Sequence, residues 1–216
     1  MYKTAIFDLD GTLLDTLGDL SDSVNATLAR FGYPTRTEDE VRRFVGNGVR
    51  LLIARALPRG EDDPRFEEVL SAFRTHYAQN SEKRTAPYAG ISTLLAHLHT
   101  AGVRVAVVSN KFDAAVKKLC TTYFGDTVEV AIGETPEIAK KPAPDTVFKA
   151  LAALGESADG AVYIGDSEVD VETARAAGIP CISVLWGFRD RDLLAAHGAT
   201  DFAETAEELE KMLLHS

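Results

Sequence analysis

Short runs of apolar residues alternate with amphipathic stretches along most of this 216-residue chain. Several of the runs are apolar at successive positions, which is typical of central parallel strands covered by helices on both faces. These runs cover residues 4–9, 103–109, 128–132, 161–165 and 181–186. Between them, apolar residues recur at helical spacing over 91–98, 112–123, 145–154, 169–177 and 204–214. The alternation predicts an α/β fold built on a doubly wound parallel sheet.

Residues 16–87 break this alternation, because the pattern contains no strand there. Apolar residues at helical spacing predict helices over 17–31, 49–57 and 66–77, and a shorter one over 38–45. We therefore expect a small helical domain, 16–87, inserted after the first strand and lying over the C-terminal edge of the sheet. The core domain would then consist of residues 1–15 and 88–216.

Composition and charge narrow the classes of partner. Hydrophobic residues make up 45% of the chain and charged residues 26%, which is ordinary for a soluble globular protein. The formal net charge of -10 argues against nucleic acid or an anionic membrane surface as the main partner. Two cysteines, 61 positions apart, suggest neither a disulfide framework nor a zinc site. The sequence shows no apolar leader and no apolar run long enough to span a membrane, so we expect a cytoplasmic protein. We expect it to be a monomer or a homodimer.

The first apolar run ends in two carboxylates, Asp8 and Asp10, and Gly11 then allows a tight turn. Strand side chains alternate faces, so these two project the same way, at the end where open α/β sheets bind ligands. Two carboxylates this close repel each other unless a cation lies between them, and Mg²⁺ prefers oxygen ligands. The pattern favours a magnesium site, with an acidic turn after an edge strand as the alternative.

Polar residues also follow the other predicted strands. They are Ser109 and Asn110, then Lys141 before a proline, then Asp166 with Asp170 four residues on. Taken singly, each has an ordinary explanation as a turn residue, a solvated lysine or a first-turn acid of a helix. Because all of them lie at or just past the C-terminal ends of strands, the topology brings them into one crevice. A carboxylate nucleophile, an acid/base, a hydroxyl, a lysine and metal-binding acids form a phosphoryl-transfer site.

Four motifs together resemble the haloacid dehalogenase-like hydrolase superfamily, in order and spacing along nearly the whole chain. They are Asp8-Leu-Asp-Gly-Thr12, Ser109-Asn110, Lys141-Pro142 and Gly165-Asp166-Ser167-x-x-Asp170. The resemblance implies that Asp8 is a nucleophile that forms an aspartyl-phosphate. It also implies that Asp10 protonates the leaving oxygen and then activates water. The helical insert is similar to the α-helical cap of that superfamily.

The same resemblance assigns the remaining site residues. Ser109 and Lys141 would hold the phosphoryl oxygens, and Thr12 and Asn110 would lie among the substrate-binding residues. The cofactor would be Mg²⁺, bound by Asp8, the main-chain carbonyl of Asp10, Asp166 and Asp170.

Three activities of the superfamily fit this chain poorly. Dehalogenases typically lack the second acid, which is present here as Asp10. Members resembling β-phosphoglucomutase carry a histidine where this chain has Leu20, and phosphonatases need a lysine in the cap, where residues 16–81 have none. The stretch 8–20 and the Gly46-Asn47-Gly48 turn look closer to phosphoglycolate phosphatases.

We therefore expect a Mg²⁺-dependent phosphomonoester phosphatase acting on a small-molecule phosphate ester such as 2-phosphoglycolate. Pyrophosphate, nucleoside monophosphates and sugar phosphates are alternative substrates. The turn at Gly46, Asn47 and Gly48 offers backbone N–H groups to an anionic substrate, and Arg50, or else Arg43, could pair with its carboxylate. The alternative is a plain interhelix connector with solvated arginines. A receiver-like phospho-acceptor and an inactive interaction protein fit less well, since Asp10 and the insert favour an enzyme.

Overall fold

The computed structural model describes residues 1–215 and separates the chain into two compact units. One consists of Met1–Leu14 and Pro87–Ser216, and the other of Asp15–Ala86. We call them the α/β unit and the helical unit. Two short strands, β2 (Leu14–Asp15) and β3 (Ala86–Pro87), pair into a small sheet where the chain passes from one unit to the other. The hydrophobic pattern had predicted neither of these strands.

A six-stranded sheet forms the centre of the α/β unit, in the order β5-β4-β1-β6-β7-β8, and every pairing is parallel. The strands are β1 (Thr4–Phe7), β4 (Arg104–Phe112), β5 (Val130–Glu134), β6 (Ala161–Gly165), β7 (Cys181–Val184) and β8 (Asp201–Ala203). The predicted doubly wound α/β fold is confirmed. The chain moves outward from β1 in one direction and then in the other, so the switch point lies at the C-terminal ends of β4, β1 and β6. The pattern missed β8, a three-residue edge strand with one buried side chain.

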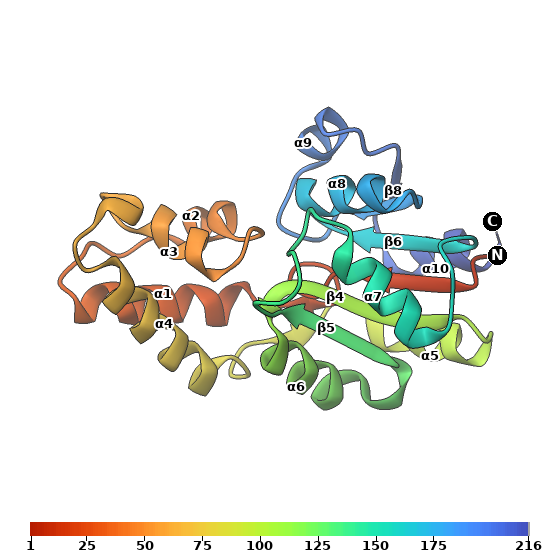
Figure 1. Cartoon of the computed structure of the whole chain (residues 1–216), viewed down its shortest axis with the longest axis horizontal. Helices are drawn as coiled ribbons and strands as arrows, with labels where there is room; N and C mark the ends of the chain where they lie inside the picture. Colours follow the sequence, from red (N-terminus) through yellow and green to blue (C-terminus); the bar gives the residue numbers. More distant parts are fainter. Residues whose placement is uncertain (216) are drawn as a thin grey trace. The chain divides into compact units, whose positions relative to one another are not determined.

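Helices cover both faces of the sheet (Figure 1). The core on one face includes side chains of α5 (Ile91–Thr100), α6 (Asp113–Phe124) and α10 (Ala206–Leu214). The core on the other includes side chains of α7 (Asp145–Leu154) and α8 (Glu168–Ala177). Strand β1 supplies both, because Ala5 and Phe7 pack on the first face and Ile6 on the second. A short 3₁₀ helix, η2 (Gly125–Thr127), follows α6.

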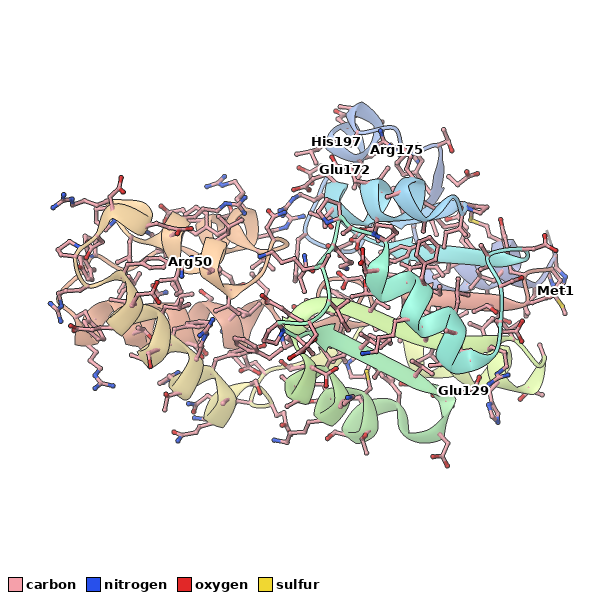
Figure 2. The ribbon with its side chains drawn as sticks, viewed as in Figure 1. Met1, Arg50, Glu129, Glu172, Arg175 and His197 are labelled. Carbon is pink, nitrogen blue, oxygen red and sulfur yellow. The ribbon has the colours of Figure 1, made fainter. Side chains whose placement is uncertain are left out.

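A short helix that the pattern did not predict, α9 (Arg191–Ala196), packs against α8 through Leu194 and Val171. Polar contacts join the same two elements at the surface (Figure 2). Arg175 Nη2 donates to the carbonyl of His197 at 2.9 Å, and His197 Nδ1 lies 3.3 Å from Glu172 Oε1. Helix α9 is thus held against α8 by both apolar and polar contacts.

Strand β4 continues past the predicted limit of residue 109 to Phe112. Its pairing with β5 is irregular between Val108 and Phe112. The three polar residues in that stretch, Ser109, Asn110 and Lys111, are nevertheless buried. A polar segment buried at the C-terminal end of a central strand is the position at which such sheets bind ligands.

The helical unit contains α1 (Leu17–Arg30), α2 (Glu38–Phe44), α3 (Val49–Ala56), a short 3₁₀ helix η1 (Gly60–Asp62) and α4 (Phe66–Asn80). Helix α1 packs against α4 and α2. The carboxylate of Asp19, which is 2% exposed, accepts hydrogen bonds from Arg84 N at 2.9 Å, Thr85 N at 2.9 Å and Thr85 Oγ1 at 2.8 Å. This carboxylate fixes the segment after α4 to α1. Among residues 1–215, no helix has the length and apolar character needed to cross a membrane.

Candidate active site

Asp8 directly follows β1 and stays in register with the sheet, since its N–H donates to the Ile164 carbonyl at 2.8 Å. The backbone then turns at Gly11, whose φ of 90° lies in a region that side chains other than glycine rarely adopt. A Cβ at Gly11 would also lie 2.4 Å from Asp166 Oδ2. The glycine therefore allows the strand ends of β1 and β6 to bring their acids together.

Three buried carboxylates converge at this point. Ligand oxygens of Asp8, Asp166 and Asp170 lie within 4.8 Å of one another. Asp166 is held by Thr12 Oγ1 at 3.0 Å and by the N–H of Phe188 at 2.7 Å. The cluster combines the end of β1 with the turn between β6 and α8.

Asp170 belongs to the first turn of α8 and also faces the cluster. Its Oδ2 accepts hydrogen bonds from the N–H of Ser167 at 3.0 Å and from Ser167 Oγ at 2.6 Å. The first-turn explanation is confirmed, because one carboxylate oxygen satisfies the helix N-terminus. The other oxygen faces the cluster, and its role as a metal ligand stays a prediction.

Lys141 bridges the cluster from the loop after β5. Its Nζ lies 2.8 Å from Asp8 Oδ1 and 2.8 Å from Asp170 Oδ1, and its side chain is 2% exposed. The same amine donates to the hydroxyl of Tyr163 at 3.0 Å, and Asn110 Nδ2 donates to the Lys141 carbonyl at 3.1 Å. Of the two adjacent lysines, the one before the proline is thus the buried one.

Burial governs the electrostatics of this cluster. Desolvation raises the pKa of Asp8 from 3.8 to about 7, and the nearby Lys141 ammonium only partly offsets it. Desolvation and the neighbouring carboxylates Asp170 and Asp8 raise the pKa of Asp166 well above its usual range. For Lys141, burial alone would lower the pKa, but the carboxylates of Asp170 and Asp8 outweigh it and hold the pKa well above its ordinary value.

Asp10 projects beside the cluster and is paired with a residue that the sequence reasoning missed. Lys111 Nζ lies 2.7 Å from Asp10 Oδ1, and the two side chains are 4% and 14% exposed. Ser109 Oγ accepts a hydrogen bond from the N–H of Lys111 at 3.3 Å. The signal was present in the sequence, since a lysine next to Ser109-Asn110 at the end of a central strand enters the same crevice.

The donor set suits a hard divalent cation. All ligand atoms of the cluster are carboxylate oxygens, as Mg²⁺ prefers. Four carboxyl groups, including that of Asp10, face the ammonium groups of Lys111 and Lys141, so full ionisation leaves a formal charge of −2. One divalent cation would balance that charge.

The loop after β7 supports the site as well. Trp186 Nε1 donates to the Thr12 carbonyl at 3.0 Å. A Cβ at Gly187 would lie 2.3 Å from Asp166 Cβ and 2.5 Å from the Gly11 carbonyl oxygen. Only a glycine fits there, because the loop passes against both turns that carry the acids. Thr12 and Asn110, predicted to bind substrate, support Asp166 and the Lys141 loop, and their substrate contacts stay predictions.

The predicted anion-binding turn lies in the helical unit. Gly46 and Gly48 have φ values of 122° and 87°, and Gly48 precedes the first turn of α3. Asn47 Oδ1 accepts a hydrogen bond from Arg55 Nη2 at 2.9 Å. The contact of this turn with substrate stays a prediction.

Arg50, labelled in Figure 2, is engaged within the helical unit. Its guanidinium lies 2.8 Å from Glu61 Oε2 and 2.8 Å from Glu67 Oε1, and 4.6 Å from the centroid of the Phe66 ring. The hydrogen bonds that Arg50 donates to Glu67 and Glu61 raise its pKa. A substrate carboxylate would have to compete with both glutamates.

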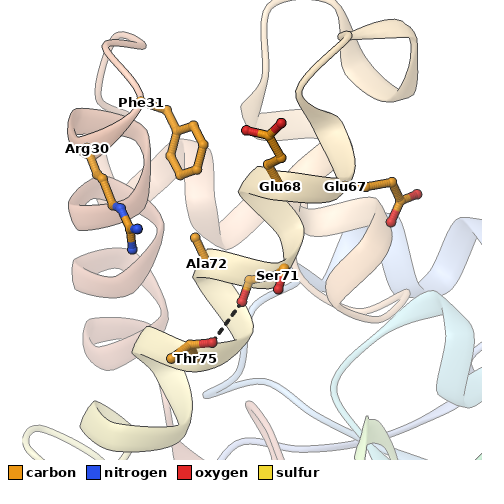
Figure 3. A pocket seen from close by; sticks show the side chains of 7 residues that line it. All are labelled: Arg30, Phe31, Glu67, Glu68, Ser71, Ala72 and Thr75. Atoms are coloured by element: carbon orange, nitrogen blue, oxygen red, sulfur yellow. Dashed lines mark hydrogen bonds between the residues drawn. The ribbon is translucent and has the colours of Figure 1, made fainter.

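A groove on the helical unit runs between the end of α1 and the face of α4 (Figure 3). Its lining residues are Arg30, Phe31, Glu67, Glu68, Ser71, Ala72 and Thr75. Within it, Thr75 Oγ1 donates to the Ser71 carbonyl at 3.1 Å. None of the predicted site residues lines this groove.

The parallel sheet and the carboxylate–lysine cluster at its switch point define an α/β protein with the residues of a phosphoryl-transfer hydrolase. Residues 5–184 match the family described as haloacid dehalogenase-like hydrolase. The chain belongs to this family, as its four motifs predicted.

Relatives within the family are similar over most of the chain. A phosphoglycolate phosphatase of Mesorhizobium japonicum is 37% identical over 86% of this chain and 84% of its own length. One of Rhodospirillum rubrum is 36% identical over 97% and 91%. A crystal structure from Lactobacillus delbrueckii, provisionally named a phosphoglycolate phosphatase, is 36% identical, with a TM-score of 0.95 over 100% of this chain and 99% of that one.

Proposed function

We propose that this hydrolase is a Mg²⁺-dependent phosphomonoester phosphatase that forms an aspartyl-phosphate on Asp8, acting on a small phosphorylated metabolite such as 2-phosphoglycolate. One observation carries the proposal. The Asp8 carboxylate lies in a buried cluster of three carboxylates and also pairs with the buried ammonium of Lys141 at 2.8 Å. A nucleophile that must meet a phosphate dianion needs this positive charge beside it.

The metal would be held by Asp8, Asp166, Asp170 and the main-chain carbonyl of Asp10. When bound, Mg²⁺ would offset the repulsion between the cluster and the phosphoryl group and so lower the cost of bringing two anions together. The burial that raises the pKa of Asp8 to about 7 supports this role, because a nearby cation favours the ionised, nucleophilic form.

In the proposed first step, a carboxylate oxygen of Asp8 attacks phosphorus while the ester bond to the leaving oxygen breaks. Asp10 gives its proton to that oxygen, and the alcohol departs. In the second step, Asp10 takes a proton from water as the water oxygen attacks phosphorus. The acyl-phosphate bond breaks, phosphate leaves and the Asp8 carboxylate is restored.

The remaining residues position the phosphoryl group in this scheme. Lys141 shares its ammonium between Asp8 and the phosphoryl oxygens, and Ser109 offers its hydroxyl at the end of β4. Tyr163 is a positioning residue, since its hydroxyl contacts both Lys141 at 3.0 Å and Asp170 at 3.1 Å. The role of the helical insert as a substrate-selecting cap stays a prediction.

The choice of 2-phosphoglycolate is supported by the names of relatives at 36–37% identity over most of the chain. A panel of phosphate esters with Mg²⁺ tests it, including pyrophosphate, nucleoside monophosphates and sugar phosphates. We expect the highest kcat/KM for 2-phosphoglycolate. Equal or better hydrolysis of another ester would reassign the substrate, and no hydrolysis of any ester would refute the phosphatase.

The nucleophile is tested on the same panel with Asp8→Asn, for which we expect kcat to fall on the order of 10⁴-fold or more. Asp126→Asn, at an exposed position in η2, is the matched control and should keep full activity. Turnover by Asp8→Asn at the wild-type rate would leave the mechanism without its nucleophile.

A further inference from the structure

We propose that Lys111 determines the substrate class of this site by binding a carboxylate on the leaving group, next to the ester oxygen. This inference rests on the proposed phosphatase function and deepens it. It names the substrates as phosphate esters of short 2-hydroxy carboxylic acids, from a side chain of the α/β unit itself.

Burial and pairing single out this lysine. Among residues 1–215, Lys111 and Lys141 are the two buried lysines. Lys141 serves the nucleophile side, with Asp8 and Asp170, whereas Lys111 lies 2.7 Å from Asp10, the proposed acid/base. A lysine is seldom buried without an ionic partner, because removing its charge from water is costly. The site therefore has one ammonium beside the proposed nucleophile and one beside the proposed acid/base.

The reach of the Lys111 amine fits a carboxylate close to the ester oxygen. Asp10 must come within hydrogen-bond distance of the leaving oxygen to protonate it. The amine is itself within hydrogen-bond distance of Asp10, so it lies one contact further along the leaving group. In the phosphate of a 2-hydroxy acid, a single carbon separates the ester oxygen from the carboxylate, which places that carboxylate beside the amine.

Selectivity follows from an exchange of partners. While Lys111 is paired with Asp10, the ammonium holds that carboxylate, and moving Asp10 toward the leaving oxygen breaks a buried ion pair. A substrate carboxylate can replace Asp10 as the partner and free it to face the leaving oxygen. A neutral leaving group cannot make this exchange, so it meets an acid/base still held by the lysine.

The test compares 2-phosphoglycolate with 2-hydroxyethyl phosphate, an ester of similar size in which a neutral hydroxymethyl group replaces the carboxylate. We expect Lys111→Met to lower kcat/KM for 2-phosphoglycolate by about 10- to 100-fold, the value of a hydrogen bond to a charged group, and to raise kcat/KM for the neutral ester, because Asp10 is then no longer held by the lysine. Lys111→Arg, which keeps the charge, should recover part of the preference. Lys117→Met is the matched control, because Lys117 pairs with Asp113 at 2.6 Å but is 60% exposed, and it should change neither substrate.

Each other outcome counts against the proposal. Equal losses on both esters would make Lys111 a positioning residue for Asp10, and unchanged selectivity would overturn the inference outright. Selectivity lost in Arg50→Ala but kept in Lys111→Met would assign the carboxylate to the helical unit instead. A wild type that hydrolyses no ester of the panel would refute the phosphatase itself. One that hydrolyses other panel esters but not 2-phosphoglycolate, or hydrolyses both test esters equally, would refute only the role of Lys111.

A second measurement does not depend on the folding of Lys111→Met. In the inactive Asp8→Asn protein with Mg²⁺, calorimetry should show tighter binding of 2-phosphoglycolate than of 2-hydroxyethyl phosphate, by about tenfold or more. Lys111→Gln in that background should remove the difference. Equal affinities in Asp8→Asn, or a difference that survives Lys111→Gln, would contradict the proposal.

Discussion

Replacing Asp8 by asparagine should stabilise the metal-free protein, and the gain should grow with pH. Burial raises the pKa of this carboxyl group from 3.8 to about 7. A group whose pKa is higher in the folded state keeps its proton there while the unfolded chain releases it. Its contribution to stability is therefore complete below about pH 4 and is lost as the pH rises to about 7.

The size of the effect follows from the pKa shift. Relative to a side chain that stays neutral in both states, Asp8 lowers the free energy of unfolding by about 4 kcal/mol at pH 8. At pH 5, where only the unfolded chain ionises, the loss is about 2 kcal/mol. Asp8→Asn removes this cost, so its advantage over the wild type should grow by about 2–3 kcal/mol between the two pH values. For a chain of this length that corresponds to about 5–10 °C in Tm.

The assay is thermal unfolding of wild type, Asp8→Asn and the exposed control Asp126→Asn, each in excess EDTA at pH 5 and pH 8. Saturating Mg²⁺ at pH 8 should then stabilise the wild type by about 3 kcal/mol at 100 times its Kd, and Asp8→Asn by clearly less. If Asp8→Asn raises the Tm by the same amount at both pH values, or has a lower Tm than the wild type at pH 8, then burial does not raise the pKa of Asp8.

Three further substitutions test the packing around the site. Gly11→Ala, whose Cβ would lie 2.4 Å from Asp166, should lower the free energy of unfolding by at least about 2 kcal/mol and abolish most of the activity. Gly32→Ala is also at positive φ, but its Cβ would meet open space. It should lower the free energy of unfolding by about 1 kcal/mol and leave the activity unchanged. Urea denaturation and turnover measurements check the two glycine variants. Equal losses of stability in both would contradict the close contact between Gly11 and Asp166. Asp170→Asn should lower the free energy of unfolding by about 3 kcal/mol at pH 7, because Asp170 is fully buried and the substitution breaks its ion pair with Lys141. An unchanged free energy of unfolding in urea would contradict this prediction. Asp19→Asn should destabilise the helical unit by about 2 kcal/mol through its lost hydrogen bonds, seen as faster amide exchange at residues 84 and 85.

Local spacing made the acidic part of the site readable from the sequence. Asp8 and Asp10 share a strand face at i and i+2, and Asp166 and Asp170 are separated by about one helical turn. Because each pair follows a strand, the parallel topology alone brings them to one edge. In the structure, Asp8, Asp166 and Asp170 form a buried cluster, as this topology predicts.

Tertiary contacts placed the parts of the site that the sequence left out. None of the predicted motifs included Lys111, which the continuation of β4 to Phe112 buries against Asp10. None of them included Tyr163 either, yet its hydroxyl joins Lys141 to Asp170. Such residues are ordinary in their local context, and their roles arise from partners far away in the chain.

The central claim is that Asp8 becomes phosphorylated, and trapping the acyl-phosphate tests it most directly. Asp10→Asn, which lacks the proposed base for the second step, is mixed with Mg²⁺ and p-nitrophenyl phosphate, whose leaving group needs little protonation. The reaction is quenched with borohydride, which reduces an aspartyl-phosphate to homoserine, and peptides are sequenced by mass spectrometry. We predict homoserine at position 8 and none in Asp8→Asn/Asp10→Asn. Modification at another residue, or a burst of nitrophenol with position 8 unmodified, would contradict the mechanism.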